Sequence, residues 1–143
     1  MLLGEYQHSL DDKGRLAIPA KFRKILSDGV VITRGLDACL YLYPLEEWTK
    51  LADKLAKLPI NQADSRAFSR LMLAGASHAE IDSQGRVLLP EYLRKYSGIS
   101  SKAVIIGIYN RAEIWDESRW REYRAGVEER SDEIAERLGN LEI

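Results

Sequence analysis

The sequence predicts an α+β protein in which two copies of one short unit pack into a single body. Residues 8–25 and 79–96 follow the same pattern at a constant offset of 71. The coinciding positions are Asp11/Asp82, Gly14/Gly85, Arg15/Arg86, Pro19/Pro90, Arg23/Arg94 and Lys24/Lys95. A unit on the order of 50 residues buries too little apolar surface to be stable alone, so we expect the copies to share one core.

Each copy is expected to begin with a strand, a glycine turn and a second strand that stops at a proline. Leu16 and Ile18 alternate onto one face. Gly14 suits a left-handed turn residue, so the first two strands are predicted to form a short hairpin. Pro19 and Pro90 each open a short helix. The expected strands lie at 7–11, 15–18, 30–33 and 39–43, and again at 79–82, 86–89, 103–108 and 112–115.

Two helices are expected between the copies and one after them. The first has apolar residues at three- and four-residue spacing and ends before Pro59. The second runs from Gln62 to Leu73 and closes at Gly75. The C-terminal helix starts at Asp116, a suitable N-cap. The apolar positions are Leu45, Trp48, Leu51, Leu55 and Leu58 in the first helix, Ala63, Ala67, Leu71 and Ala74 in the second, and Trp120, Tyr123 and Val127 in the third.

These boundaries predict four segments. They are a first repeat at 5–47, a helical linker at 48–75, a second repeat at 76–119, and a C-terminal helix with an acidic tail at 120–143.

The net charge of −1 conceals an uneven distribution of charged residues. Residues 1–112 hold 16 lysines and arginines against 12 carboxylates, whereas residues 113–143 hold 5 against 10. A basic body with an acidic tail is compatible with a polyanionic partner, because the partner meets the local field. We expect no membrane span and no signal peptide. The single Cys39 leaves a reducing cytoplasm as the expected compartment.

The motif Asp-x-x-x-Arg spans the turn in both copies, as Asp11…Arg15 and Asp82…Arg86. The aspartate is placed to orient the arginine or to accept hydrogen bonds from turn amides. One interpretation is a surface ion pair that shapes the turn, worth only ~0–1 kcal/mol. The other is an arginine presented to phosphate or guanine. Recurrence of the motif where Gln84 replaces Lys13 keeps both interpretations open.

Basic residues follow the motif more densely in the first copy than in the second. The first copy carries Lys13, Arg15, Lys21, Arg23 and Lys24, and the second carries Arg86, Arg94 and Lys95. With two carboxylates in each aligned window, 11–25 has a charge of +3 and 82–96 a charge of +1. Arg15 is therefore expected to lie in the field more favourable to phosphate.

Several segments together resemble the bacterial MraZ family. They are Gly4-Glu5-Tyr6-Gln7-His8, Asp11-x-x-x-Arg15-Leu-x-Ile-Pro19, Thr33-Arg34-Gly35-Leu36-Asp37 and Ala67-Phe68-Ser69-Arg70. The resemblance covers positions 1–123. It implies two tandem AbrB-like swapped-hairpin modules, packed as one pseudo-symmetric body with linker and C-terminal helices.

The same resemblance implies a cytoplasmic, nucleoid-associated transcriptional regulator. Such a protein binds repeated boxes in double-stranded DNA upstream of the division and cell-wall gene cluster, and assembles into a ring. Applied to this sequence, the expected DNA-binding residues are Asp11, Lys13, Gly14, Arg15, Lys21, Arg23, Lys24, Asp82, Gly85 and Arg86. A homo-oligomer is also expected from the apolar helix faces carrying Trp48, Leu55, Trp120 and Tyr123.

Other classes of function have less support. We expect no enzyme, cofactor or small-molecule substrate, because Asp11 and Asp12 have no accompanying nucleophile motif or phosphate loop. A metal site is not expected, because His8 and His78 are one position out of register between the copies. Cys39 is expected to be a small buried hydrophobe. An antitoxin-like protein-binding module remains an alternative, and RNA is a further possible partner.

Overall fold

The structure, a computed structural model, describes residues 1–141. The last two residues of the predicted acidic tail, 142 and 143, lie outside the described part. The strands are β1 Leu2–Ser9, β2 Arg15–Ala17, β3 Val30–Arg34, β4 Leu40–Pro44, β5 Ser77–Ala79, β6 Arg86–Leu88, β7 Lys102–Tyr109 and β8 Ala112–Asp116. The helices are α1 Ala20–Arg23, α2 Leu45–Ala56, α3 Ala63–Ser69, α4 Glu91–Ser97, α5 Glu117–Glu129 and α6 Ser131–Arg137.

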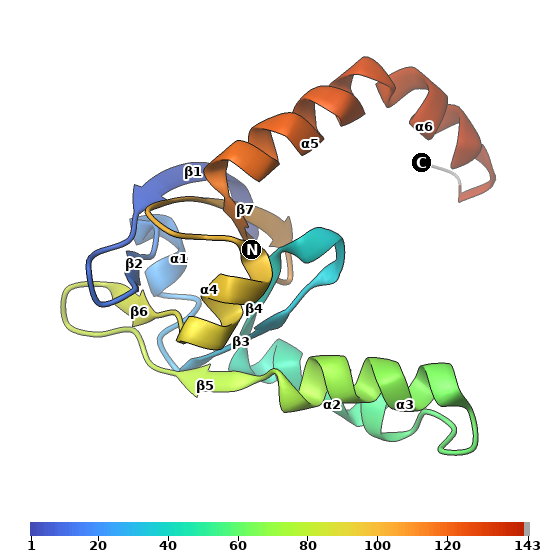
Figure 1. The fold of residues 1–143 in the computed structure, drawn as a ribbon, viewed down its shortest axis with the longest axis horizontal. Helices are drawn as coiled ribbons and strands as arrows, with labels where there is room; N and C mark the ends of the chain where they lie inside the picture. The colour runs from blue at the N-terminus through green and yellow to red at the C-terminus, as the bar shows by residue number, and fades with distance from the viewer. Residues whose placement is uncertain (142–143) are drawn as a thin grey trace.

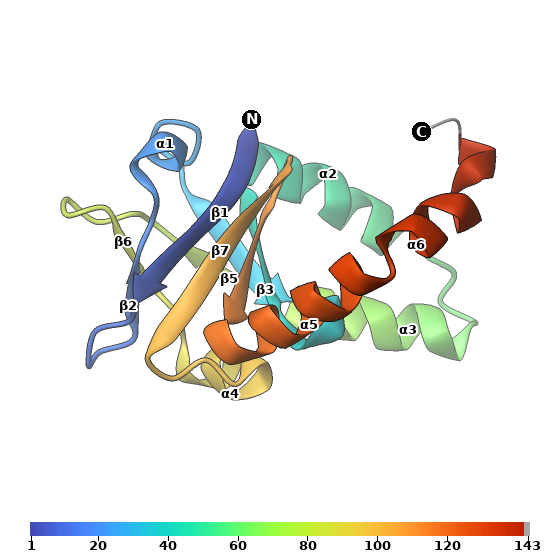
Figure 2. The same ribbon diagram turned by 90° about the horizontal axis from the view of Figure 1, so that it is seen from above.

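The two copies exchange strands rather than folding separately. Six strands form one antiparallel sheet in the order β1-β7-β8-β4-β3-β5, and β2 pairs with β6 in a second sheet. Strand β1 of the first copy pairs with β7 of the second, and β5, which follows the linker, pairs with β3 of the first. Figures 1 and 2 show the resulting single body. The predicted α+β fold with intertwined copies is thus confirmed.

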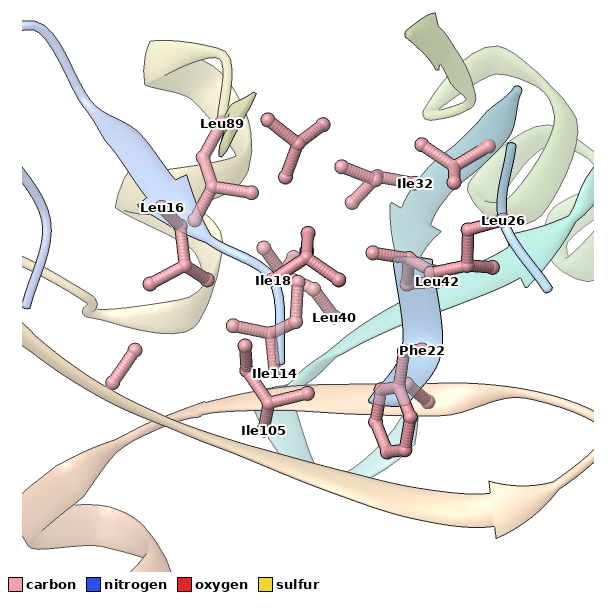
Figure 3. Packing of buried hydrophobic residues seen from close by; sticks show 14 of the residues in the cluster. Leu16, Ile18, Phe22, Leu26, Ile32, Leu40, Leu42, Leu89, Ile105 and Ile114 are labelled. Carbon is pink, nitrogen blue, oxygen red and sulfur yellow. The ribbon is translucent and has the colours of Figure 1, made fainter. Parts of the chain in front are cut away.

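The shared core explains why neither copy is complete alone. Leu16 and Ile18 of the first copy are buried beside Val87 and Leu89, their equivalents in the second. Figure 3 shows Leu16, Ile18 and Leu89 in the same buried cluster as Phe22. Removing a buried side chain of this size typically costs ~2–5 kcal/mol, so each copy supplies a large part of the stability of the other.

The predicted hairpin forms only at its closed end. The Asp11 amide donates to the Arg15 carbonyl at 3.0 Å, and one bridge joins Leu10 to Leu16. Beyond that bridge the strands diverge, because β1 is hydrogen-bonded to β7 along its whole length and β2 takes β6 as its partner. The prediction of a paired hairpin is therefore correct for the turn and wrong for the rest of the two strands.

The second linker helix differs from its prediction. Helix α3 ends at Ser69 and continues as a π-helical turn over Arg70–Ala74. The wider turn brings Met72 into the core. On the predicted apolar face, Ala63, Ala67 and Ala74 are exposed and Leu71 is half-buried. The hydroxyl of Thr33 donates to the Met72 carbonyl at 2.6 Å, which satisfies a backbone group within the altered turn.

A second apolar cluster occupies the other face of the large sheet. Cys39, Val104, Ile106 and Trp115 are buried there. Trp120 packs on Trp115, with ring centroids 5.2 Å apart. Burial raises the pKa of the Cys39 thiol, in agreement with its expected role as a small hydrophobe.

Two helical segments, α2–α3 and α5–α6, project away from the small sheet. The Asp116 carboxylate caps α5 by accepting from the Arg119 amide at 3.3 Å, which confirms the predicted N-cap. In Figures 1 and 2, α3 and α6 lie at the end of the molecule opposite the β2 and β6 turns.

Leu55 of α2 is only 4% exposed, so the prediction that it offers free apolar surface for an oligomer is wrong.

Candidate nucleic-acid interface

The β2–β6 ribbon places the two repeated arginines on one outward face. Its register pairs Arg15 with Leu88 and Ala17 with Arg86. Because side chains directly opposite each other share a face, all four of these residues lie on the same side. The other side carries Leu16, which is fully buried. Burial of the inner face thus fixes the outward direction of both arginines, which lie diagonally across the ribbon.

Asp11 organises the first turn through three hydrogen bonds. One carboxylate oxygen accepts from the backbone amides of Lys13 and Arg15, at 3.0 and 2.9 Å. The second oxygen accepts from Nε of Arg15 at 2.6 Å. The aspartate therefore performs both predicted tasks at once, because it holds the turn backbone and orients the guanidinium.

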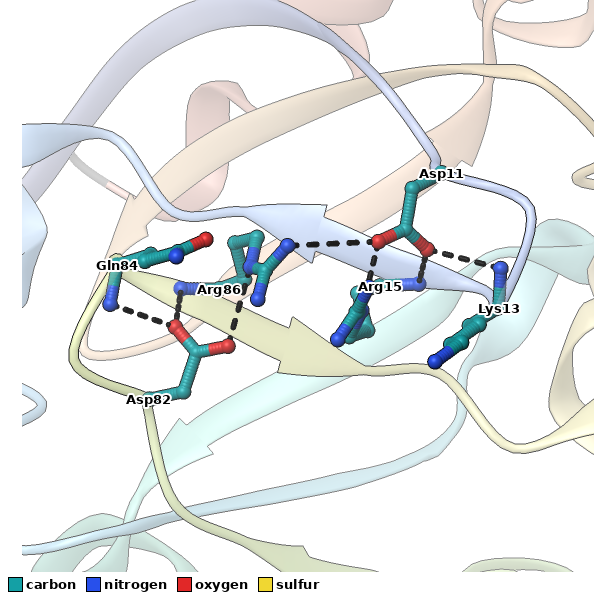
Figure 4. A network of polar contacts seen from close by, with 6 residues as sticks. All are labelled: Asp11, Lys13, Arg15, Asp82, Gln84 and Arg86. Carbon is teal, nitrogen blue, oxygen red and sulfur yellow. Dashed lines mark hydrogen bonds and ion pairs between the residues drawn. The ribbon is translucent and has the colours of Figure 1, made fainter.

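Asp82 repeats this arrangement in the second copy. Its carboxylate accepts from the amides of Gln84 and Arg86, both at 2.9 Å, and from Nε of Arg86 at 3.0 Å. The replacement of Lys13 by Gln84 keeps the same pattern of hydrogen bonds, because only the backbone amide of that residue takes part. Figure 4 shows the two motifs at opposite ends of the ribbon.

The two motifs are joined by one contact across the ribbon. Nη1 of Arg86 lies 3.5 Å from the Asp11 carboxylate, which also binds Arg15. The hydrogen bond from the Arg15 amide, with further help from the guanidinium, lowers the pKa of Asp11 to about 2. The Arg86 amide likewise lowers the pKa of Asp82. Both carboxylates are thus ionised at neutral pH and hold their arginines by charge-assisted bonds.

The turn glycines provide backbone conformations that other residues rarely adopt. Gly14 and Gly85 have φ of +80° and +78°. Each glycine carbonyl also accepts a hydrogen bond from the other copy: Ile18 N donates to the Gly85 oxygen at 2.8 Å, and Leu89 N donates to the Gly14 oxygen at 2.9 Å. The two turns are therefore hydrogen-bonded reciprocally to the strand ends of the opposite repeat.

Arg23 and Arg94 cover these glycines from the helices that follow the strands. Nε of Arg23 donates to the Ile18 carbonyl at 3.0 Å, and Nε of Arg94 donates to the Leu89 carbonyl at 2.9 Å. A Cβ built on Gly14 would lie 2.8 Å from Nε of Arg94, and one on Gly85 would collide with the guanidinium of Arg23. Arg94 is absent from the sequence-predicted site, although its coincidence with Arg23 in the repeat was the signal that could have identified it.

The predicted lysines lie on the surface of the first copy. Lys13, Lys21 and Lys24 are all exposed. The second copy has Tyr92 at the position equivalent to Lys21, and the Tyr92 hydroxyl donates to the Gly75 carbonyl at 2.8 Å. At this position the first repeat therefore has an exposed lysine, whereas the second has a tyrosine that is hydrogen-bonded to the end of the helical linker.

Metal-binding clusters and membrane-spanning helices are both absent from residues 1–141. Within that range, no cluster of three or more histidine, cysteine or carboxylate side chains is arranged to hold a metal ion. None of the helices described there is both long and apolar enough to cross a membrane.

Two consecutive parts of the chain, residues 1–71 and 72–140, match the family model described as "MraZ protein, putative antitoxin-like". The chain belongs to the MraZ family. It is 48% identical to the transcriptional regulator MraZ of Natranaerobius thermophilus over 143 residues, which is 100% of both chains. The corresponding proteins of Lactobacillus delbrueckii and Moorella thermoacetica are 48% and 46% identical, also over 100% of both chains. The family resemblance indicated by the sequence motifs is confirmed.

A solved structure gives a weaker likeness. The solution structure of PHS018 from Pyrococcus horikoshii shares 18% identity, with a TM-score of 0.34, over 80% of this chain and 88% of that one.

The two matches to the MraZ family model meet after residue 71, and this length equals the offset of the internal repeat.

Proposed function

We propose that this protein is a sequence-specific DNA-binding transcriptional regulator that acts in the cytoplasm on the nucleoid. Relatives that match its whole length are named transcriptional regulators. The observation that carries the proposal is the outward face of the β2–β6 ribbon, where Asp11 and Asp82 hold Arg15 and Arg86 in place. Its targets are repeated boxes upstream of the division and cell-wall gene cluster.

The chemistry of the ribbon supports DNA as the partner. Each arginine uses Nε for its own aspartate. Nη1 of Arg86 also lies 3.5 Å from Asp11, so the donors offered to a guanine edge or a phosphate are the Nη groups of Arg15 and Nη2 of Arg86. A two-stranded ribbon also fits the width of the major groove. The side chains of Arg15 and Arg86 are 32% and 26% exposed, which combines access with a fixed orientation. Because the aspartates already hold both arginine side chains in place, these side chains lose less conformational entropy when DNA binds.

We further propose an oligomer larger than a dimer, built as a ring. A single ribbon makes few contacts, and a protein that neutralises few phosphates gains little affinity at physiological salt. Several ribbons on one ring, matched to repeated boxes, bind much more tightly by raising the effective concentration of each. An apolar surface is available for assembly at α5, where Tyr123 packs on Trp115 and remains 43% exposed.

The test is a binding titration with a duplex from the promoter ahead of the organism's own division and cell-wall genes. A duplex with scrambled boxes is the matched control. We expect at least about a thousandfold preference for the intact boxes, and a loss of affinity as salt rises. Equal binding of the two duplexes by the wild-type protein would refute the proposal.

Variants of the ribbon assign the preference to its arginines. The double variant Arg15→Ala/Arg86→Ala is expected to bind both duplexes alike while keeping the circular dichroism of the folded protein. Lys57→Ala, which removes an exposed cation at the end of α2, controls for loss of charge. Retention of box preference by the double variant would show that another surface recognises the sequence.

An antitoxin-like function is the second candidate, favoured by the description of the matching family model. In that case the projecting α5–α6 segment would bind a small toxic protein. Expression in the native host followed by affinity purification separates the two functions, because an antitoxin is recovered in a stoichiometric complex with its toxin.

A further inference from the structure

The two turns that carry the repeated arginines are each covered by an arginine from the other repeat. Arg94, in α4 of the second copy, lies against Gly14 of the first, and Arg23, which ends α1 of the first copy, lies against Gly85 of the second. Although both turns are at the surface, both glycines are buried. Each repeat therefore supplies the arginine that covers the turn glycine of the other repeat.

Each covering arginine is anchored at a point that also contacts the opposite turn. Nε of Arg23 binds the Ile18 carbonyl at 3.0 Å, while the amide of Ile18 donates to the Gly85 carbonyl at 2.8 Å. Arg94 makes the equivalent contact with Leu89, whose amide donates to the Gly14 carbonyl at 2.9 Å. One residue on each side thus connects the guanidinium to the turn that it covers.

We propose that Arg94 and Arg23 are positioning residues, each of which fixes the arginine-bearing turn of the opposite repeat. Arg94 acts on the turn that orients Arg15, and Arg23 acts on the turn that orients Arg86. This role differs from the direct DNA contact that the sequence suggested for Arg23. It rests on the proposed function only for its effect on DNA, because the effect on the turns exists in the free protein.

Amide hydrogen exchange of the free protein tests the crossed arrangement without DNA. The reporters in the first turn are the amides of Lys13 and Gly14, both bonded to Asp11. Those in the second turn are the amides of Gln84 and Gly85, bonded to Asp82. All four can be followed in one spectrum.

We expect Arg94→Ala to accelerate exchange at the first turn about tenfold and to leave the second turn unchanged, the coupling being of the size found between residues in contact. Arg23→Ala is expected to do the reverse. Lys95→Ala removes a neighbouring exposed cation and should affect neither turn. Acceleration of the turn in the variant's own repeat, or of both turns equally, would overturn the proposal.

A charge-conserving variant separates geometry from electrostatics and serves if Arg94→Ala fails to fold. Arg94→Lys keeps the positive charge but lacks both the Nε–H that binds Leu89 and the planar group that covers Gly14. It is therefore expected to exchange as fast at the first turn as Arg94→Ala. Wild-type protection in Arg94→Lys would show that charge alone is needed and would refute the positioning role.

Binding to the box-containing duplex gives a second measurement, made in the Arg86→Ala background. There Arg23→Ala should cause no further loss, because its turn no longer carries an arginine. Arg94→Ala should weaken binding about tenfold further. A further loss from Arg23→Ala would mean direct contact with DNA. If the arginine variants of the ribbon bind like wild type, the proposed role of the ribbon in DNA binding fails, while the exchange experiment still decides the positioning role.

Discussion

Asp11 and Asp82 make the same local hydrogen bonds, yet they differ in one contact across the ribbon. Asp11 also lies 3.5 Å from Arg86, whereas Arg15 forms no ion pair with Asp82 among the described residues. Arg86 is thus held by two carboxylates, and Arg15 by one. Two carboxylates near one guanidinium reduce its attraction for phosphate. The contact between Arg86 and Asp11 therefore adds to the difference in net charge between the repeats, and both favour Arg15 over Arg86 for binding phosphate.

We therefore predict that Arg15→Ala abolishes binding to the operator without unfolding the protein, and that Arg86→Ala weakens binding less. Loss of one specific arginine contact costs ~1–3 kcal/mol per site, and the loss is multiplied over repeated sites. Titrations of both variants at one fixed salt concentration measure the difference. Greater damage from Arg86→Ala, or wild-type binding by Arg15→Ala, would contradict the charge argument.

The lowered pKa of Asp11 predicts how stability changes in acid. Its pKa is about 2 in the folded protein, below the ordinary value of 3.8 for an aspartate. A group with a depressed folded pKa stabilises the protein above its unfolded pKa, and this contribution is lost as pH falls through the folded value. We expect Asp11→Asn to reduce the fall in unfolding free energy between about pH 4 and pH 2. Urea titrations across this window measure it, and an unchanged slope would contradict the prediction.

At the scale of elements, two glycines with different surroundings should respond in opposite ways to alanine. Gly14→Ala forces a left-handed alanine against the guanidinium of Arg94, so we expect a loss of ~1–3 kcal/mol in urea unfolding. Gly126 lies in α5, where an added methyl group would meet no neighbouring side chain within 4 Å. Gly126→Ala should therefore slow amide exchange along α5 about fivefold. Similar stability of Gly14→Ala and wild type would contradict the role of the turn.

The elements differ in how far the sequence predicts them. The contacts of Asp11 with Arg15 could be predicted, because four residues and a tight turn fix them locally. The pairing of β2 with β6 could not, since two three-residue strands with the same alternation carry no information about their partners. The π turn after Ser69 accepts a hydrogen bond from Thr33 of β3, a residue distant in sequence that a local pattern does not reveal. The contact of Arg94 with Gly14 depends on the pairing of β2 with β6. The sequence therefore shows that Arg23 and Arg94 coincide in the repeat, but not what they contact.

At the scale of the whole molecule, the acidic tail past about Arg124 should be dispensable for contact with DNA, and removal of its outer part tests this. Arg124 of α5 binds Glu5 of β1 at 2.7 Å, so a chain ending at Arg130 keeps that attachment. The removed residues 131–143 contain four carboxylates and one arginine. We expect truncation to leave specific binding unchanged or up to about tenfold tighter at low salt, because repulsion of phosphate is removed. Loss of binding would show that the tail is structural.

The proposed assembly predicts the mass of the particle in solution. With a chain of 16.3 kDa, we expect a mass above that of a dimer at micromolar concentration. Tyr123→Glu places a charge on the exposed aromatic surface of α5 and should lower that mass. Analytical ultracentrifugation of both proteins measures the difference, and a monomeric wild-type protein would exclude the ring.

The exchange of strands also sets the order in which the chain can fold during synthesis. Strand β1 is among the first segments to leave the ribosome, but its partner β7 begins at Lys102. At roughly 5–20 residues per second, the edge of β1 waits about 5 to 20 s for that partner. During this time the edge of β1 is open to incorrect partners, among them strands of neighbouring nascent chains. Carrying both repeats in one chain supplies the correct strand at a high effective concentration, so the duplication protects the new chain from pairing with its neighbours.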